Sequence, residues 1–307
     1  MKRDLLNLLD LSRDELCRLL DRSEQLKRSQ KQGQALLPLA GKTLAMIFEK
    51  RSTRTRISFE AGIYQLGGQS IFMSPDQMQL SRGEPIRDTA RVMSRYVDGV
   101  IIRNDSHQQL KEFARFASVP VINALSDLYH PCQVLSDLFT LREAGLKIEK
   151  MKLAYIGDPN NVFNSWVGAS ALLGFELRLA SPKGYEPEPR VLKAAAKAGE
   201  VKLKHFHNPK SAARAADVLY TDVWVSMGQE SGANEKISEF RGFQINKKLL
   251  AAVGKPTLVM HCLPAHRGEE ITGQVLENYA SLIFTQAENR LHCQKAILEF
   301  FIAGNNP

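Results

Sequence analysis

The chain has 307 residues, of which 44% are hydrophobic and 24% are charged. This length is typical of two domains, and the composition excludes collagen-like, fibrous and wholly disordered proteins. The formal net charge of +8, from 41 Lys and Arg against 33 Asp and Glu, is compatible with a nucleic acid or a small anion as partner. The basic residues form no long run and no block interleaved with aromatic residues, so nucleic-acid binding rests on net charge alone.

The start of the chain and its cysteines favour a cytoplasmic protein. Polar residues interrupt the first apolar ones, no cleavage site follows, and no stretch reaches the ~18 apolar residues of a membrane helix. The cysteines, at positions 17, 132, 262 and 293, lack CxxC spacing, and the histidines lack the H-E-x-x-H pattern. We therefore expect no disulfide framework, no metal, no membrane segment and a reducing, cytoplasmic location.

In chain order, the apolar pattern predicts one helix and then an alternation of strands and helices. Ser12 and Glu15 form a capping box before leucines at helical spacing, which predicts a helix from about Arg13 to Gln30 that stops near Gly33. Short apolar runs predict strands at Thr43–Phe48, Ser70–Met73, Gly99–Ile102, Val119–Ile122, Lys152–Ile156, Glu176–Ala180, Val201–Phe206, Val218–Thr221, Thr257–Met260 and Leu282–Phe284. An amphipathic helix from about Glu288 to Ala303 ends the pattern.

This alternation predicts an α/β fold with two similar lobes, each a parallel sheet with helices on both faces. We expect a first domain over 1–145, a second over 146–286, and a C-terminal helix within 287–307 that packs back on the first domain. In open α/β sheets the ligand binds beyond the carboxyl ends of the strands. Polar residues just after the predicted strands are therefore the candidates for an active site in the cleft between the lobes.

The first strand is followed by hydroxyls and arginines where a helix begins: Ser52, Thr53, Arg54, Thr55 and Arg56. Amides and hydroxyls at a helix start donate to anions, the helix dipole favours negative charge, and arginine matches phosphate. The Walker A pattern G-x-x-x-x-G-K is missing. The alternative is an ordinary N-cap with solvated arginines, but the density of donors favours an anion site.

Two later strands of the first lobe also end in polar residues. Arg103 follows the third strand, and alone it is compatible with a solvated strand end. His130 and Gln133 follow the fourth strand in H-P-C-Q, where Pro131 fits the first turn of a helix. The imidazole could polarise a carbonyl oxygen, although a capping histidine beside an exposed glutamine is an equal reading.

The second lobe offers a different set of groups. G-D-P-N-N, Gly157 to Asn161, lacks the G-x-G-x-x-G of a dinucleotide site, and its asparagines are also common turn formers. D-V-W-V-S-M-G, Asp222 to Gly228, suits a small cationic ligand or is only a polar loop. H-C-L-P, His261 to Pro264, contains Cys262. This cysteine could be a nucleophile, a thiol that accepts and donates protons, or simply a buried residue. Oxyanion-binding groups in one lobe and ammonium-binding groups in the other imply group transfer between two small ligands.

The motifs S-T-R-T-R, H-P-C-Q, D-x-x-x-S-M-G and H-C-L-P, in this order and spacing, resemble those of the ornithine carbamoyltransferases from about Phe48 to Arg290. The first two are shared by transcarbamoylases generally, and the last two point to ornithine. The resemblance implies transfer of the carbamoyl group of carbamoyl phosphate to the δ-amine of L-ornithine, which gives L-citrulline and phosphate. It also implies no metal or cofactor, no nucleic-acid partner, and a homotrimer or a multiple of trimers.

The resemblance carries residue roles by motif match. It implies that carbamoyl phosphate is bound by Ser52, Thr53, Arg54, Thr55, Gln79, Arg103, His130, Gln133, Cys262, Leu263 and Arg290. Gln79, in M-Q-L-S-R-G-E, would act from its own or a neighbouring subunit. It implies that ornithine is bound by Asn161, Asp222, Ser226 and Met227. The implied catalytic groups are Arg54, Arg103, His130, Asp222 and Cys262.

Three points stay open at this level. Pro159 stands where the family often has glycine, so either Asn160 or Asn161 could face ornithine. A transcarbamoylase for another amine, such as putrescine, would also use Asp222. A non-catalytic protein that binds anions or RNA through its basic surface is the alternative of a different class.

Overall fold

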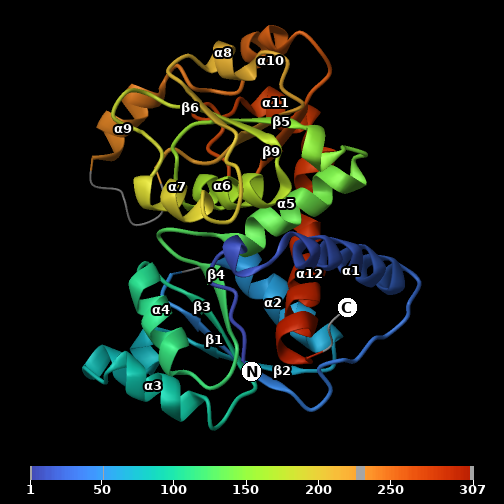
Figure 1. Cartoon of the computed structure of the whole chain (residues 1–307), viewed down its shortest axis with the longest axis vertical. Helices are drawn as coiled ribbons and strands as arrows, with labels where there is room; N and C mark the ends of the chain where they lie inside the picture. The colour runs from blue at the N-terminus through green and yellow to red at the C-terminus, as the bar shows by residue number, and fades with distance from the viewer. Residues whose placement is uncertain (1, 51, 226–231, 305–307) are drawn as a thin grey trace. The chain divides into compact units, whose positions relative to one another are not determined.

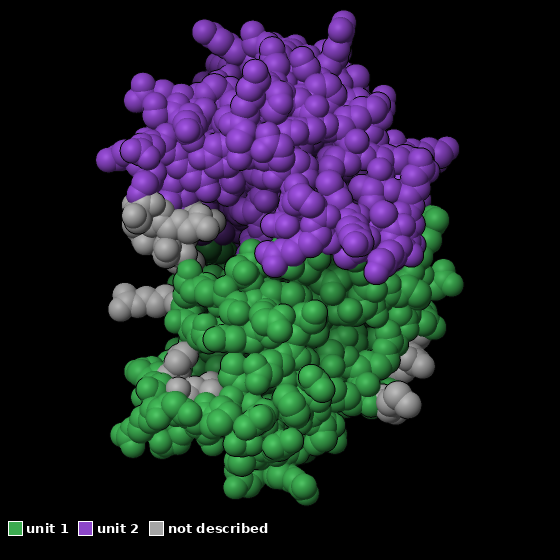
Figure 2. Space-filling view, turned by 60° about the vertical axis from the view of Figure 1, so that its left-hand side comes forward, with its two compact units in different colours: residues 1–139, 288–307 green, residues 140–287 purple. Residues whose placement is uncertain are grey.

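The computed structural model describes residues 2–50, 52–225 and 232–304 (Figure 1). The chain divides into two compact units, unit 1 (Met1–Phe139 and Glu288–Pro307) and unit 2 (Thr140–Ala287), which Figure 2 colours separately. Each unit contains one parallel β-sheet. Within the described ranges, no helix combines the length and the apolar character needed to cross a membrane.

The sheet of unit 1 has the strand order β2-β1-β3-β4. Its strands are β1 (Thr43–Phe48), β2 (Gln69–Met73), β3 (Gly99–Arg103) and β4 (Val121–Leu125). Its helices are α1 (Arg13–Lys31), α2 (Thr53–Gln65), α3 (Ile86–Met93), α4 (His107–Phe116), the first part of α5 (Pro131–Glu143) and the second part of α12 (Ala280–Ile302). Short 3-10 helices lie at η1 (Leu8–Asp10), η2 (Pro75–Gln77) and η3 (Gln79–Arg82).

Helices cover both faces of this sheet. Ala45 and Ile47 of β1 and Ile102 of β3 pack against Met93 of α3 and Phe113 of α4 in one buried cluster. Ala45 and Ile47 are two residues apart on β1, and Ile102 is the register partner of Ile47, so all three share one face of the sheet. The opposite face carries α2 and the red helix α12 (Figure 1).

The sheet of unit 2 has the strand order β7-β6-β5-β8-β9. Its strands are β5 (Lys152–Ile156), β6 (Glu176–Ala180), β7 (Leu203–Phe206), β8 (Val218–Thr221) and β9 (Leu258–His261). Its own helices are η4 (Ile148–Lys150), α6 (Asn161–Leu173), α7 (Pro189–Ala195), α8 (Pro209–Ala213), α9 (Ala233–Phe240), α10 (Lys247–Val253) and α11 (Gly273–Asn278).

The core of unit 2 has packed aromatic rings on one side of the sheet and a mixed cluster of aliphatic and aromatic residues on the other. The rings of Tyr155 on β5 and Tyr220 on β8 stack at 5.5 Å, and Trp166 of α6 meets Tyr220 edge-on at 5.6 Å. The neighbouring strand residues Ala154 and Leu219 belong to the cluster on the other face. This alternation buries both faces, as expected for a parallel sheet.

The predicted α/β architecture with two parallel sheets and helices on both faces is confirmed. The strand predicted at Leu282–Phe284 is wrong, because these residues lie inside α12, which begins at Ala280 instead of near Glu288. Three apolar residues fit a strand and a helix turn equally, and no breaker separates them from the helix that follows. Arg290 therefore lies in the interior of the last helix, not at its start.

Candidate active site

The segment between β1 and α2 forms the first part of a polar cluster in unit 1. Ser52 is the N-cap of α2, and its Oγ accepts the N–H of Thr55 at 3.3 Å. Thr55 is buried, and its Oγ1 accepts a hydrogen bond from Nη2 of Arg290 at 2.8 Å. Phe48 pairs with Arg103 in the parallel register of β1 and β3, so the polar residues at the carboxyl ends of both strands lie at the same end of the sheet.

Arg290 connects three helices of unit 1. Its second amino group, Nη1, donates to Oε1 of Gln133 on α5 at 3.0 Å. Gln133 in turn donates from Nε2 to Oδ1 of Asp137 at 2.8 Å. Asp137 is fully buried and was not predicted as a site residue, although its i,i+4 spacing from Gln133 places the two side chains on one helix face. The side chains of the cluster are thus held in place by hydrogen bonds between residues of α2, α5 and α12.

The electrostatics of this cluster are those of closely placed positive charges. Burial, followed by the charges of Arg290, Arg103 and Arg54, lowers the pKa of His130 well below its usual value. Burial and the charges of Arg290 and Arg54 lower the pKa of Arg103 to about 10. Like charges held together at low solvation are costly unless an anion neutralises them. The cluster therefore favours a multiply charged anion.

Buried arginine nitrogens in this cluster include some without a hydrogen-bond acceptor in the described part of the chain. Nε of Arg54 and Nε of Arg103 are buried, and neither finds a hydrogen-bond acceptor among the residues that the structure describes. Arg56, expected from the sequence to belong to the same donor set, is exposed instead. Its Nε bonds Oε1 of Glu60 at 2.9 Å, and its guanidinium lies 3.6 Å from the ring centroid of Phe72.

The structure does not bring Gln79 to this cluster. Gln79 is exposed on η3, and none of the contacts described for unit 1 joins it to the arginines. Its predicted role stays a prediction.

Unit 2 places Asp222 and Asn160 together beyond the ends of β5 and β8. Asn160 is the N-cap of α6, and its Oδ1 accepts two backbone N–H groups of the first turn. The same oxygen accepts the hydroxyl of Tyr155 at 3.0 Å. The amide nitrogen of Asn160 donates to Oδ2 of Asp222 at 2.7 Å. Because Asn160 is committed to holding Asp222 and the helix start, Asn161, the half-buried first residue of α6, is the better candidate for a ligand contact.

The carboxylate, imidazole and thiol of Asp222, His261 and Cys262 lie near one another, with a ligand atom of each within 4.8 Å of the others. Asp222 also accepts the N–H of Val223 on Oδ1 at 2.8 Å, which fixes its orientation. The three groups could hold a soft divalent cation, but both ring nitrogens of His261 already have hydrogen-bond partners. A metal would have to displace one of these bonds, so the arrangement fits a proton-handling site better than a metal site.

A buried network fixes the turn that carries Cys262. Nδ1 of His261 accepts the N–H of Leu263 at 2.9 Å, so the proton of this imidazole sits on Nε2, which donates to Oε1 of Glu270 at 2.9 Å. Leu263 has φ of 57°, a conformation that non-glycine residues rarely adopt and that this bond helps to hold. Sequence reasoning missed Glu270, because G-E-E carries no spacing signal that links it to His261.

Two of the residues implied for ornithine, Ser226 and Met227, lie outside the described residues. Apart from Gln79, the remaining implied residues are divided between the two units. Ser52, Thr53, Arg54, Thr55, Arg103, His130, Gln133 and Arg290 belong to unit 1, whereas Asn161, Asp222, Cys262 and Leu263 belong to unit 2.

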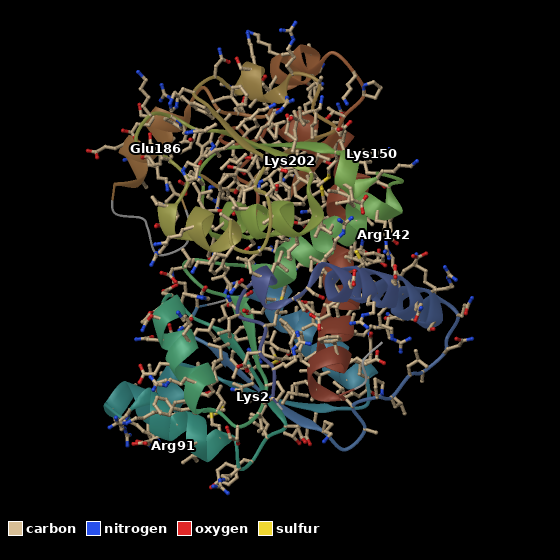
Figure 3. The ribbon with its side chains drawn as sticks, in the orientation of Figure 1. Lys2, Arg91, Arg142, Lys150, Glu186 and Lys202 are labelled. Atoms are coloured by element: carbon tan, nitrogen blue, oxygen red, sulfur yellow. The ribbon has the colours of Figure 1, made fainter. Side chains whose placement is uncertain are left out.

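Basic residues lie on many separate elements. Arg91 lies on α3 of unit 1, whereas Arg142 on α5, Lys150 on η4 and Lys202 before β7 belong to unit 2 (Figure 3). Arg91 is ion-paired with Asp88 at 3.2 Å. A nucleic acid needs a continuous basic stripe or patch, and these separate positions do not by themselves indicate one, so nucleic-acid binding still rests on net charge alone.

Two family models match the chain and together span nearly all of it. The carbamoyl-P binding domain of aspartate/ornithine carbamoyltransferase matches residues 3–143, and the Asp/Orn binding domain of the same family matches residues 149–301.

Curated proteins and solved structures with high coverage agree with these models. An ornithine carbamoyltransferase from Syntrophus aciditrophicus is 52% identical over 302 residues, which cover 98% of this chain and 100% of the relative. The crystal structure of the anabolic ornithine carbamoyltransferase from Campylobacter jejuni superposes with a TM-score of 0.93 at 44% identity, covering 99% of this chain and 100% of the other. The ornithine carbamoyltransferase from Pyrococcus furiosus gives a TM-score of 0.92 at 47% identity, covering 99% and 98% of the two chains. From both models and this similarity over the full length, the chain belongs to the aspartate/ornithine carbamoyltransferase family.

Proposed function

We propose that this chain is an ornithine carbamoyltransferase, which transfers the carbamoyl group of carbamoyl phosphate to the δ-amine of L-ornithine and releases L-citrulline and phosphate. The observation that carries the proposal is the cationic cluster of unit 1, in which Arg54, Arg103 and Arg290 all act on the buried His130. A phosphate dianion on a carbonyl carbon is the ligand that such a cluster suits. The high identity to enzymes of this name supports the choice of substrates.

Carbamoyl phosphate is bound in unit 1. The backbone amides and hydroxyls of Ser52, Thr53 and Thr55 and the guanidinium of Arg54 hold its phosphate at the start of α2. Arg103 and His130 face its carbonyl oxygen. Since the low pKa keeps His130 neutral, it acts as a hydrogen-bond donor or acceptor and does not add a further positive charge.

Gln133 and Arg290 complete the donor set, and their mutual hydrogen bond keeps both in place before the substrate arrives. Preorganised donors of this kind cost no rearrangement when charge develops in the transition state. Gln79 adds a further contact to the same substrate, from its own or a neighbouring subunit.

L-Ornithine is bound in unit 2. The δ-ammonium meets the carboxylate of Asp222, while Asn161, Ser226 and Met227 contact the rest of the amino acid. An aliphatic amine is mostly protonated at neutral pH and must lose a proton before it attacks. Asp222 and Cys262 lie close together and are placed to accept and pass on that proton. Leu263 lines the reacting end, held by its bond to His261.

The reaction is a direct transfer. The neutral δ-amine attacks the carbamoyl carbon, an oxyanion forms on the carbonyl oxygen, and the C–O bond to phosphate breaks as the oxyanion collapses. Arg54, Arg103 and His130 stabilise the growing negative charge, and one such donor is typically worth about 3–4 kcal/mol of barrier. The departing phosphate can take the final proton. Holding both reactants in line supplies much of the remaining acceleration.

We also propose that the chain acts in the cytoplasm as a homotrimer or a multiple of trimers. Support for self-association comes from apolar side chains that face solvent near the edge of the sheet of unit 1. Ile57 on α2 is 58% exposed and Ile71 on the edge strand β2 is 44% exposed. An uncovered edge strand with apolar neighbours is a common place for association.

The substrate choice is tested by supplying carbamoyl phosphate with L-ornithine, putrescine, lysine or aspartate and measuring both phosphate release and the carbamoylated product. We expect citrulline from ornithine at a rate far above the others, because Asp222 binds an amine and the remaining contacts bind the amino-acid group. A putrescine rate equal to the ornithine rate would identify the enzyme as a transferase to another amine. RNA binding with a steep salt dependence and no phosphate release would refute catalysis altogether.

A further inference from the structure

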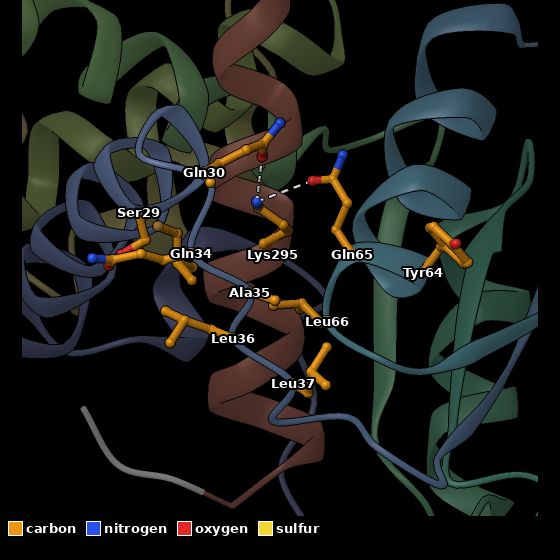
Figure 4. Close-up of a pocket in the computed structure, with 12 residues that line it drawn as sticks. Ser29, Gln30, Gln34, Ala35, Leu36, Leu37, Tyr64, Gln65, Leu66 and Lys295 are labelled. Carbon is orange, nitrogen blue, oxygen red and sulfur yellow. Dashed lines mark hydrogen bonds between the residues drawn. The ribbon is translucent and has the colours of Figure 1, made fainter.

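A pocket of about 380 Å³ lies in unit 1 among the C-terminal end of α1, the segment that follows it, the C-terminal end of α2, and α12 (Figure 4). Its walls are largely apolar, with Leu26, Leu36 and Leu66 among them, and Leu37 and Tyr64 are exposed at its rim. At one side of the pocket lies the amine of Lys295, which the proposed transfer reaction does not use.

The amine of Lys295 has neutral partners. Its Nζ bonds Oε1 of Gln30 at 2.6 Å and Oε1 of Gln65 at 3.1 Å, and Figure 4 shows it between these two side chains. The residue is 3% exposed, yet Gln30 is exposed, so the amine lies one side chain below the surface. Burial lowers the pKa of Lys295 to about 8, and among the described residues no charged group contributes to this shift.

We propose that Nζ of Lys295 is a site of covalent carbamoylation by isocyanic acid, a small uncharged carbon electrophile that enters this pocket. In the reaction, the lone pair of the neutral amine forms a bond to the carbon of HN=C=O. The electrons of the C=N π-bond move to the isocyanate nitrogen, which takes up the proton lost by the amine. The product is a ureido lysine, and nothing else is released.

The pocket suits both reactant and product. A neutral amine has two N–H groups for the two glutamine oxygens, and its lone pair stays available for attack. The ureido group is uncharged, so it avoids the penalty that burial imposes on the ammonium. It also keeps N–H donors for Gln30 and Gln65.

Carbamoyl phosphate is a source of the electrophile, because it eliminates phosphate to give isocyanic acid. An enzyme that binds carbamoyl phosphate is therefore exposed to isocyanic acid. This point about the source rests on the proposed function, whereas the reactivity of Lys295 does not.

The test is treatment of the native protein with dilute sodium cyanate at pH 7.5, followed by mass spectrometry of its peptides over time. Lys31 and Lys150, both exposed, serve as internal references. We expect Lys295 to be carbamoylated about tenfold faster than either, because burial gives its amine a larger neutral fraction, although a less basic amine is also less nucleophilic. With total cyanate fixed, the fraction present as isocyanic acid falls about tenfold per pH unit, whereas the neutral fraction of an amine rises only up to its pKa. We therefore expect the rate at Lys295 to stay level up to about pH 8 and to fall above it.

The matched control is Gln30→Glu, which places a carboxylate of equal size against the amine. This charge should keep Lys295 protonated and slow its modification at pH 7.5 severalfold, with Lys31 and Lys150 unchanged. Citrulline formation, measured on the same samples, should be equal in the two proteins and reports on the proposed function independently. The proposal is overturned if Lys295 stays unmodified while Lys31 and Lys150 react, or if Gln30→Glu leaves the rate at Lys295 unchanged.

Discussion

At the scale of single residues, the charges of Arg54, Arg103 and Arg290 act together on His130. Each of them lowers the pKa of this buried imidazole, in addition to the effect of burial. The same like-charge environment lowers the pKa of Arg103 to about 10. Such shifts are typical of sites that stabilise negative charge in a reaction. His130 therefore belongs to the donors and acceptors of the site and not to its titrating bases.

The pH dependence of stability tests whether His130 is neutral in the folded protein. Its pKa lies below the unfolded value of about 6.5, so its contribution is fully present above pH 6.5 and is lost as the pH falls further. We expect His130→Gln to lose less unfolding free energy than the wild type between pH 7 and pH 5, as measured by urea unfolding at each pH. Equal losses in the two proteins would show that His130 is not buried in the neutral form.

At the scale of elements, α12 fixes the donor set of unit 1 through Arg290. This side chain bonds Thr55 of α2 and Gln133 of α5 with different amino groups of one guanidinium. Lysine offers a point charge and cannot reproduce this forked geometry. The position of Arg290 in the middle of α12, instead of at a helix end, keeps its backbone rigid.

We expect Arg290→Lys to raise KM for carbamoyl phosphate about tenfold, the equivalent of about 1.4 kcal/mol, with KM for ornithine little changed. The matched control is Arg22→Lys, because Arg22 of α1 also makes a forked pair with α12, at Glu299, but outside the site. Steady-state kinetics with each substrate varied in turn measures both variants. If Arg22→Lys raised the same KM as strongly, the effect would be one of helix packing and not of substrate binding.

Most elements could be predicted from the sequence, and the exceptions have a physical cause. The capping box at Ser12 and Glu15 predicts the start of α1, and the leucines at helical spacing with the stop near Gly33 predict its end to within one residue, because both signals are local. The run Leu282–Phe284 was predicted as a strand, because three apolar residues carry no period. Only packing decides that run, since Ile283 is buried and Phe284 is exposed on the same helix.

The candidate site shows the same division between local and non-local information. Arg54 and Arg103 could be predicted, because motif and strand end are local features. Arg56 has the same local signal, yet the structure pairs it with Glu60 and Phe72. Glu270 and its bond to His261 depend on how the chain returns after β9, which no short pattern encodes.

At the scale of the whole molecule, the exposed isoleucines near β2 bear on assembly. We expect Ile57→Glu to weaken the proposed trimer, because it places a charge in an apolar contact. Light scattering at several protein concentrations would detect the smaller species. The control is Val92→Glu, which changes an exposed apolar residue on a different helix, α3. A mass unchanged by Ile57→Glu would place the contact elsewhere.

The whole molecule is proposed to act by holding one substrate in each unit while the arginine cluster stabilises the charge that develops on carbamoyl phosphate. The most direct test is kcat for citrulline formation by Arg54→Ala with both substrates saturating, beside Arg56→Ala, which removes a neighbouring arginine that is turned to Glu60 and Phe72. The account predicts a loss of about 10²–10³-fold for Arg54→Ala and little change for Arg56→Ala. Near wild-type turnover by Arg54→Ala would contradict it.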